Sequence, residues 1–275
     1  MPRCIIGTMH THTTLFSQLL ASLNVAADRP SVTVPQDWLQ GRTVYGGLAA
    51  ALCLQACQKT FPGLPPLRAA QFAFIGPAMD RLDFDCSKLR EGKSTAFVGV
   101  DLSSRGDLAA RALFCFGQGR ASALSYANLP APAAPPPEHC ELFIPAQQTI
   151  VAFAQHFDWR LAGGARPISG NAEPEMLLWV RHREGGLPPS AVPLLALADA
   201  PPPAALVRFP APAPISTITW SLEVLDETLA TDDGWWLIRT SAQTIRDGYS
   251  SQAMTVWNTR RSPVLAARQS VAIFI

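Results

Sequence analysis

Two kinds of hydrophobic pattern divide the chain into expected helices and expected strands. Two predominantly apolar runs without alternation, at residues 46–60 and 190–200, are typical of buried helices. Segments in which apolar and polar residues alternate predict strands, because successive side chains of a strand point to opposite faces. These segments are residues 67–75, 81–89, 95–103 and 108–117 in the first half and 176–183, 215–226, 235–244, 250–258 and 264–275 in the second.

The order of these elements is the same in both halves. Gly46 and Gly47 open the first expected helix, and Ser190 is a typical N-cap for the second, with Pro193 in its first turn. Each helix is followed by four strands, which predicts an α+β unit whose antiparallel sheet wraps a central helix. This plan is the hotdog fold, and two copies in one chain make a double hotdog.

Two sequence blocks recur at nearly the same spacing and support a duplication. Leu-Arg-Glu-Gly-Lys-Ser at 89–94 corresponds to Ile-Arg-Asp-Gly-Tyr-Ser at 245–250, and Leu-Ala-Ala-Arg at 108–111 recurs at 265–268. The offset is 156 residues for the first block and 157 for the second, so one inserted residue in a hairpin turn explains the change. The repeat indicates a duplicated supersecondary unit. It also aligns Ala112 with Gln269.

Prolines mark the expected connector between the two units. The chain has 25 prolines in 275 residues, against an average of about 5%. Five of them lie in residues 129–138, a run that favours an extended connector. We therefore expect an N-terminal hotdog at 1–126, a proline-rich linker at 127–148, and a C-terminal hotdog at 149–275 that carries the catalytic residues. A second proline group, at 201–214, predicts a loop after the second helix.

The charge balance and the chain start exclude several classes of partner. The chain has 22 basic and 21 acidic residues and no block of like charge. It therefore lacks the basic patch that binds a phosphate backbone, and we expect no nucleic acid partner. Charged residues make up 16% of the chain, which predicts a surface that is partly apolar or partly hidden. No secretory signal or membrane span is found, which favours a cytoplasmic protein, and Met9 is a possible start as well as Met1. Exposed sheet edges favour a homodimer.

Cysteine and histidine give no recognisable motif. The six cysteines lack a Cys-x-x-Cys pair or a nearby His, so we expect buried thiols and no metal. We expect the five histidines, which lie in tails and connectors, at the surface: His10, His12, His139, His156 and His182. Residues 92–95 copy the end of a phosphate-binding loop, but the motif lacks its first glycine and precedes a strand, so they predict a hairpin turn. No Gly-x-Ser-x-Gly elbow occurs.

Two polar residues of the second half stand alone in apolar sequence. Asp199 ends an apolar helix, where the negative end of the helix dipole raises the pKa of a carboxyl and suits a general base. The alternative is an acid exposed at the following loop. Gln269 shares a strand face with Val271 and Ile273, so its amide needs a partner. That partner is either a bound water or ligand, or a backbone group.

Thr217 is not singled out by its pattern. It alternates with Ile218 and Trp220, which places it on the polar, solvent-facing side of its strand together with Thr219. The glycines 46 and 47 have two interpretations. They can present backbone N–H groups at a helix start, or they can simply permit tight packing of the helix on the sheet.

Four sequence features together resemble the acyl-CoA thioesterase II (TesB-like) double-hotdog family. They are Trp-Leu-Gln-Gly-Arg-Thr-Val-Tyr-Gly-Gly at 38–47, the hairpin at 89–94, the helix end Leu-Ala-Asp at 197–199, and the strand start Ser-Thr-Ile at 216–218. The resemblance spans roughly residues 30 to 275, and the order and spacing of the features carry it. The chain departs from the better-known members after Thr217, where Thr-Trp-Ser replaces an Asp-His-Ser run, and after Gln269, where Ser-Val replaces an acidic residue and glycine.

The resemblance implies hydrolysis of acyl-CoA thioesters, a step of lipid metabolism, without a metal, a cofactor or a covalent intermediate. The family's catalytic Asp, Thr and Gln match Asp199, Thr217 and Gln269, which would activate and orient a water. Backbone N–H groups of Gly46 and Gly47 would bind the oxyanion. Two alternatives stay open: a non-catalytic acyl-CoA-binding hotdog protein, and an enoyl-CoA hydratase, whose Asp/His pair is not matched here.

Overall fold

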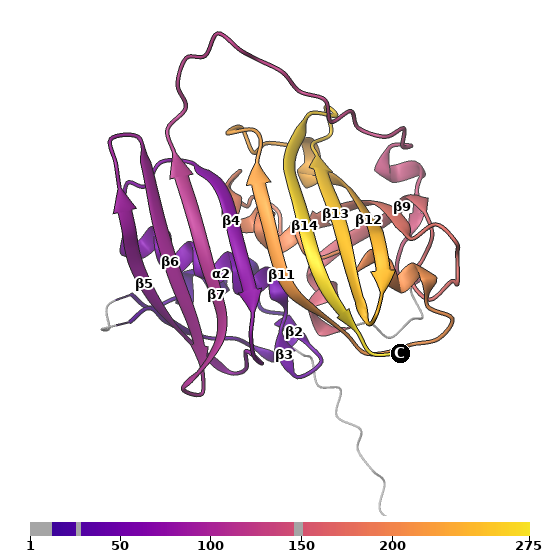
Figure 1. Cartoon of the computed structure of the whole chain (residues 1–275), viewed down its shortest axis with the longest axis horizontal. Coiled ribbons are helices and arrows are strands. Elements are labelled where there is room, and N and C mark those ends of the chain that lie inside the picture. The colour runs from indigo at the N-terminus through magenta and orange to yellow at the C-terminus, as the bar shows by residue number, and fades with distance from the viewer. Residues whose placement is uncertain (1–12, 26–28, 146–150) are drawn as a thin grey trace, which may run out of the picture.

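Ten antiparallel strands of eight or more residues carry the fold in the described part of the chain, four from the first half and six from the second (Figure 1). The computed structural model describes residues 13–25, 29–145 and 151–275. The first half contains α1 (Phe16–Ser22), β1 (Ser31–Thr33), η1 (Gln36–Trp38), β2 (Leu39–Gln40), β3 (Thr43–Val44), α2 (Gly46–Thr60), β4 (Leu67–Phe74), β5 (Arg81–Glu91), β6 (Thr95–Ser104) and β7 (Asp107–Gly117).

The second half repeats this order after a connector. It contains η2 (Pro137–His139), β8 (Glu141–Leu142), η3 (Ala152–His156), β9 (Phe157–Gly164), β10 (Glu175–His182), α3 (Ala191–Ala198), η4 (Ala204–Arg208), β11 (Ile215–Val224), η5 (Asp232–Gly234), β12 (Trp236–Arg246), β13 (Tyr249–Trp257) and β14 (Pro263–Ile273). All nine predicted strands and both predicted helices are present, and the double hotdog is confirmed. The hydrophobic pattern did not identify α1, β1 or β9.

The two sheets join into one sheet of twelve strands, in the order β1-β5-β6-β7-β4-β11-β14-β13-β12-β10-β9-β8. At the junction, β4 pairs antiparallel with β11, and Phe72 lies opposite Trp220. Their rings stack with centroids 5.5 Å apart, and both side chains are buried. The junction is therefore held by a ladder of hydrogen bonds and by an aromatic core that belongs to both units.

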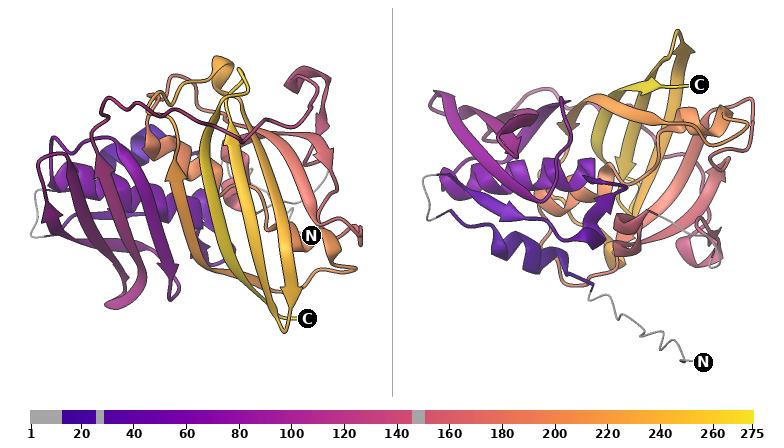
Figure 2. Two further views of the ribbon diagram at one scale, coloured as in Figure 1. Left: turned by 45° about the horizontal axis from the view of Figure 1, so that its top comes forward. Right: turned by 90° about the horizontal axis from the view of Figure 1, so that it is seen from below.

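The two central helices lie on the inner side of the joined sheet and pack against each other (Figure 2). Nearly every residue of α2 from Gly47 to Cys57 is buried, and so is every residue of α3. A helix that is apolar all round needs such an environment, because it has no face that gains from contact with water. This packing brings the N-terminus of α2 close to the C-terminus of α3.

The proline-rich linker is fastened to the outer face of the second sheet (Figure 1). Indole Nε1 of Trp179 donates to the Pro135 carbonyl at 2.9 Å, and Nε1 of Trp257 donates to the Leu129 carbonyl at 2.8 Å. The Arg261 guanidinium donates to the Ala134 carbonyl at 2.8 Å and lies 5.2 Å from the centre of the Trp179 ring. The linker thus covers outward-facing tryptophans that would otherwise meet water. The boundaries 1–126, 127–148 and 149–275 stay predictions.

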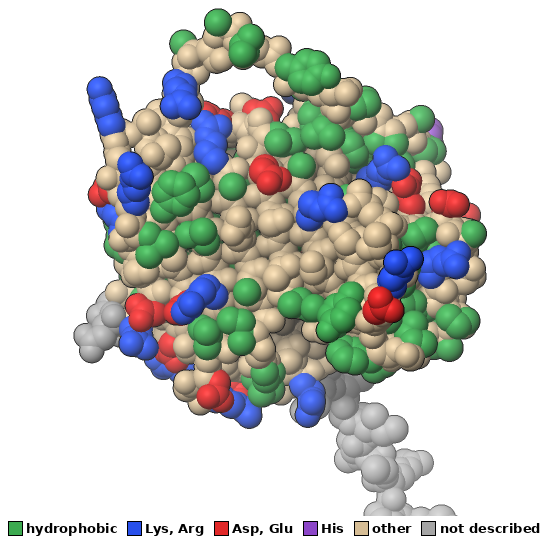
Figure 3. Space-filling view, viewed as in Figure 1, with side chains coloured by type: hydrophobic (Ala, Val, Ile, Leu, Met, Phe, Trp, Pro, Cys, Tyr) green, Lys and Arg blue, Asp and Glu red, His purple; other side chains and the backbone are tan. Residues whose placement is uncertain are grey.

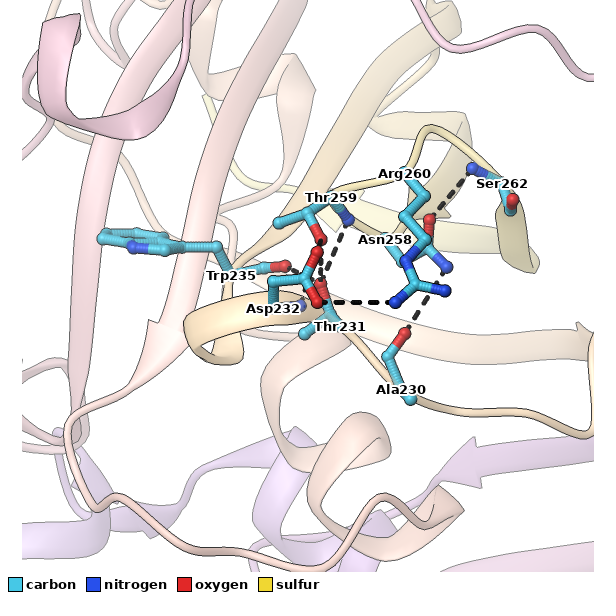
Figure 4. Close-up of polar contacts among 8 residues, drawn as sticks. All are labelled: Ala230, Thr231, Asp232, Trp235, Asn258, Thr259, Arg260 and Ser262. Atoms are coloured by element: carbon cyan, nitrogen blue, oxygen red, sulfur yellow. Dashed lines mark hydrogen bonds and ion pairs between the residues drawn. The ribbon is translucent and has the colours of Figure 1, made fainter.

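A polar network closes the end of the second sheet (Figure 4). The Thr259 hydroxyl donates to Asp232 at 3.0 Å, and Arg260 forms an exposed ion pair with the same carboxylate at 3.8 Å. Asn258 Oδ1 accepts the Ser262 N–H at 3.0 Å inside the β13–β14 turn. These contacts satisfy the backbone of a turn that is longer than its first-half counterpart, which contains only Arg105 and Gly106 between β6 and β7.

The outer face of the joined sheet carries few charges near its centre (Figure 3). Thr219, Ser221 and Ser270 lie on this face, whereas the inward positions beside them are apolar except for Gln269. This arrangement agrees with the low charged fraction of the chain. Among the described residues, no helix is long and apolar enough to cross a membrane.

The expectation that the histidines lie at the surface is wrong for two of them. His156 is 7% exposed and stacks on Trp38 with ring centroids 3.7 Å apart, while His182 Nε2 lies 2.9 Å from the Pro193 carbonyl. A neutral imidazole can pack as a flat ring once one nitrogen has a backbone partner, and burial lowers the pKa of His182 to about 4. His139 is exposed, as expected, and the first two histidines, Cys4 and the alternative start Met9 lie outside the described residues.

The described cysteines are free thiols. Cys53 and Cys57 are buried, as expected, and the other three, Cys86, Cys115 and Cys140, are partly buried. Residues 92–95 form the predicted hairpin turn, in which Gly92 N–H donates to the Thr95 carbonyl at 2.8 Å.

Candidate active site

Asp199 lies where the two units meet. It is the C-cap of α3, and its carboxyl reaches the N-terminus of α2 in the other unit. Gln269 Nε2, on β14, donates to Asp199 Oδ1 at 2.7 Å, and the backbone N–H of Gly47 donates to the same carboxyl. The Gln269 amide therefore has the Asp199 side chain as its partner, which the sequence pattern did not foresee, and Asp199 is not an exposed loop acid.

The ionisation of Asp199 is strongly perturbed. Burial raises the pKa of its carboxyl to about 7, while the hydrogen bonds from Gln269 and from the Gly47 N–H act in the opposite direction. The raised pKa agrees with the expectation from the sequence, but the main cause is loss of solvent rather than the end of the helix dipole. The residue keeps a small accessible area, because its carboxyl opens to a cavity. A carboxyl that titrates near neutral pH can both accept and return a proton.

The glycine at position 46 is required by Asp199. A Cβ atom on Gly46 would lie 2.8 Å from Asp199 Oδ2, closer than a real Cβ atom approaches an oxygen, and 3.6 Å from the Phe74 ring. Position 47 is equally closed, because a Cβ there would lie 2.8 Å from the Ala196 carbonyl oxygen. Both glycines therefore permit close packing, Gly46 against the Asp199 carboxyl and Gly47 against the Ala196 carbonyl. The Gly47 N–H is also presented at the helix start, and its acceptor is the Asp199 carboxyl.

Thr217 faces the cavity, which corrects the prediction that it faces solvent. The register between β11 and β14 shifts after Thr217: Thr217 lies opposite Val271, but Trp220 lies opposite Gln269. Two residues of β11, Ile218 and Thr219, therefore lie opposite the single residue Ser270, which is the signature of a β-bulge. The extra residue reverses the alternation on its N-terminal side, so Thr217 points inward with Trp220.

A cavity of about 850 Å³ brings the predicted residues together. Asp199, Thr217, Gln269 and Gly46 all line it, and Gly47 reaches it only through its bond to Asp199. Its walls are mostly apolar, come from both units and include five large aromatic side chains, Tyr45, Phe74, Phe143, Phe153 and Trp159. Arg166 is the one cation among the described residues that line it. Such a cavity suits a long apolar group with one polar end.

The first unit has no matching polar site among its described residues. Ala112, which the repeat aligns with Gln269, is buried between its neighbouring strands and carries no polar group. The helix α2 contains no acidic residue where α3 ends in Asp199. Within the described parts of both units, no group of three His, Cys, Asp or Glu side chains could hold a metal ion.

Two residues of the site were not expected from the sequence. Tyr45, the N-cap of α2, is 1% exposed and donates its hydroxyl hydrogen to the Ala196 carbonyl at 2.8 Å. Gln252 Oε1, on β13 opposite Gln269, accepts the Ala204 N–H at 2.6 Å and so holds the proline loop that follows Asp199. An aromatic residue directly before two glycines was the available signal for Tyr45. Gln252 has no such signal, because any alternating strand carries polar residues of this kind.

Solved structures with the same architecture share little sequence with this chain. A hot dog protein of unknown function from Alicyclobacillus acidocaldarius superposes with a TM-score of 0.86 at 21% identity, over 96% of this chain and 99% of that one. The tesB protein of Mycobacterium avium subs paratuberculosis gives 0.76 at 18%, over 94% and 99%. The acyl-CoA thioesterase II TesB2 of Mycobacterium marinum gives 0.74 at 17%, over 93% and 96%. These likenesses confirm the fold.

The sequence itself matches two domain families. Residues 34–117 match the acyl-CoA thioesterase N-terminal domain, and residues 129–273 match the acyl-CoA thioesterase C-terminal domain. A comparison with curated proteins gives no match. Because the two matched domains follow each other in order and cover most of the chain, the protein belongs to the acyl-CoA thioesterase family.

Proposed function

We propose that this chain hydrolyses acyl-CoA thioesters to CoA and a carboxylic acid, with Asp199 as the general base for a water molecule. The observation that carries the proposal is the Asp199–Gln269 pair, with its 2.7 Å hydrogen bond, at the wall of an apolar cavity. The carboxyl binds the water, and the cavity holds the acyl group. Family membership and the thioesterase II-like neighbours support the same activity.

The chemical step needs only the groups already described. The water oxygen forms a bond to the thioester carbonyl carbon while its proton passes to Asp199. The developing oxyanion accepts a hydrogen bond from the Gly46 N–H at the start of α2, where the positive end of the helix dipole also lies. The C–S bond then breaks, and the CoA sulfur leaves with the proton held by Asp199. The carboxyl is thereby restored, and no covalent enzyme intermediate forms.

Thr217 and Gln269 orient the water in this proposal. Gln269 fixes the carboxyl through Oδ1, and Thr217 offers a hydroxyl from the neighbouring strand, brought to the same wall by the bulge. A hydratase would need a histidine beside the carboxyl, and no His is among the described residues that line the cavity. The homodimer and the cytoplasmic location expected from the sequence are further parts of the proposal.

The test is release of CoA from a panel of acyl-CoAs of different chain length, followed with a thiol reagent. We expect turnover by the wild type, with kcat/KM rising with pH through about 7 as Asp199 loses its proton. Asp199→Asn should lose at least about 100-fold of that activity, and Asp107→Asn, at an exposed strand start, should keep it. Absence of wild-type turnover, or binding of acyl-CoA without release of CoA, would overturn the proposal.

A further inference from the structure

The side chain of Tyr45 joins the two central helices next to the proposed site. Its ring stacks on Phe153, with centroids 3.9 Å apart and planes 2° from parallel, and its hydroxyl donates to the Ala196 carbonyl at 2.8 Å. Ala196 belongs to α3 and lies three residues before Asp199. One hydrogen bond therefore links the residue that begins α2 to the last turn of the helix that carries the carboxylate.

The close approach of these groups depends on the second glycine. A Cβ on Gly47 would lie 2.5 Å from the Tyr45 hydroxyl oxygen and 2.8 Å from the Ala196 carbonyl oxygen. The hydroxyl, the carbonyl and the Gly47 backbone thus meet at one point, with no room for a side chain. Gly47 also donates its N–H to Asp199. Gly47 therefore packs against the Tyr45 hydroxyl and also binds the Asp199 carboxylate.

We propose that Tyr45 is a positioning residue of the proposed hydrolase, whose hydroxyl fixes the end of α3 against the start of α2 and so sets where the Asp199 carboxyl lies. The inference rests on the proposed function for its kinetic consequences. Tyr45 lines the cavity, but its hydroxyl hydrogen is donated to the Ala196 carbonyl, so it does not hold the water in this arrangement. It acts through the Ala196 carbonyl, one of the last four of α3, which have no partner within the helix.

The hydroxyl also has an electrostatic effect on Asp199. Without it, the negative end of the Ala196 carbonyl would stay uncompensated in a low-dielectric region close to the carboxyl, which disfavours the charged form of Asp199. The two groups do sense each other, since burial and the charge of Asp199 together raise the pKa of Tyr45. Two other elements contribute Gln269 and Thr217 to the cavity wall near Asp199, and both side chains are uncharged. Arg166 is the one cation among the described residues that line the cavity.

The variant Tyr45→Phe tests the proposal, because it keeps the ring stacked on Phe153 and removes only the hydroxyl. We expect kcat to fall about tenfold with KM changed less than about twofold. We also expect the midpoint of the acid limb of the pH profile to move upward by about half a unit or more. Tyr249→Phe, at a tyrosine that is 59% exposed, is the matched control and should change neither quantity.

A second measurement does not need turnover. The Asp199 carboxyl can be titrated by carbon NMR in aspartate-labelled protein and assigned by its loss in Asp199→Asn. An upward shift of its titration midpoint in Tyr45→Phe supports the proposal even if no acyl-CoA is hydrolysed, in which case only the proposed function fails. An unchanged midpoint, or a lower kcat that tracks only the folded fraction, overturns the role of Tyr45.

Discussion

Gln269 Nε2 lies 2.7 Å from Asp199 Oδ1, although the two residues are 70 positions apart in the chain. This bond ties the last strand of the second sheet to the end of the helix that the sheet wraps. Because the amide occupies Oδ1, the second carboxyl oxygen is the one that stands beside Gly46 at the cavity wall. In the proposed mechanism, Oδ2 is therefore the atom that receives the proton of the water.

A methyl group at position 46 should disable the proposed site without unfolding the protein. In Gly46→Ala the new Cβ would lie 2.8 Å from Asp199 Oδ2, so the carboxyl must move away from Gln269 or Gly47. We expect kcat/KM to fall about 10- to 100-fold, with a melting temperature within a few degrees of the wild type. Gly185→Ala is the control, because a Cβ there meets nothing within 4 Å. Equal activity of the two variants would refute the close contact.

The bulge in β11 places two nearby threonines on opposite faces of the sheet. Thr217→Val should lower kcat about tenfold or more, because it removes a hydroxyl that faces the cavity while keeping the shape of the side chain. Thr219→Val, two residues later on the outer face, should leave kcat unchanged. Steady-state kinetics of both variants decide the matter. A uniform alternation would place both residues on one face, so equal effects would argue against the bulge.

The linker should loosen when its guanidinium clamp is removed. Arg261→Ala loses the donors to the Pro132 and Ala134 carbonyls and the contact with the Trp179 ring. We expect faster proteolysis at residues 118–136 and a loss of about 1–2 kcal/mol in the free energy of unfolding. Arg260→Ala removes only an exposed ion pair with Asp232 and should have little effect. Cleavage at the same rate in both variants would show that the tryptophans alone hold the linker.

The fold can be predicted from the sequence because the hydrophobic period and the repeat are local signals. Alternation locates the long strands, and the nearly constant offset between blocks such as those at Arg90 and Arg246 indicates the duplication. The site is only partly visible in this way. Asp199 and Gln269 stand out as polar groups in apolar surroundings, but nothing local shows that each is the hydrogen-bond partner of the other.

Other parts of the site are hidden in the sequence because they depend on contacts between distant segments. The orientation of Thr217 depends on a bulge that forms only when β11 pairs with β14. The contact between Tyr45 and Ala196 depends on how two helices from different units pack. The prediction for His156 is wrong for the same reason, since its stacking partner Trp38 belongs to the other half of the chain.

The raised pKa of Asp199 should make the folded protein less stable as the pH rises through neutrality. Burial holds the pKa of the folded carboxyl at about 7, against 3.8 for the free group, so the folded chain binds this proton more tightly than the unfolded chain. The stabilisation is fully present below about pH 4 and is lost as the pH rises through about 7, by up to about 4 kcal/mol. Asp199→Asn cannot ionise, so its free energy of unfolding relative to wild type should be higher at pH 8.5 than at pH 5. Urea unfolding at both pH values measures this difference. The control Asp107→Asn, at an exposed site, should show no such difference. An equal effect of Asp199→Asn at the two pH values would mean that the Asp199 carboxyl is already ionised at pH 5.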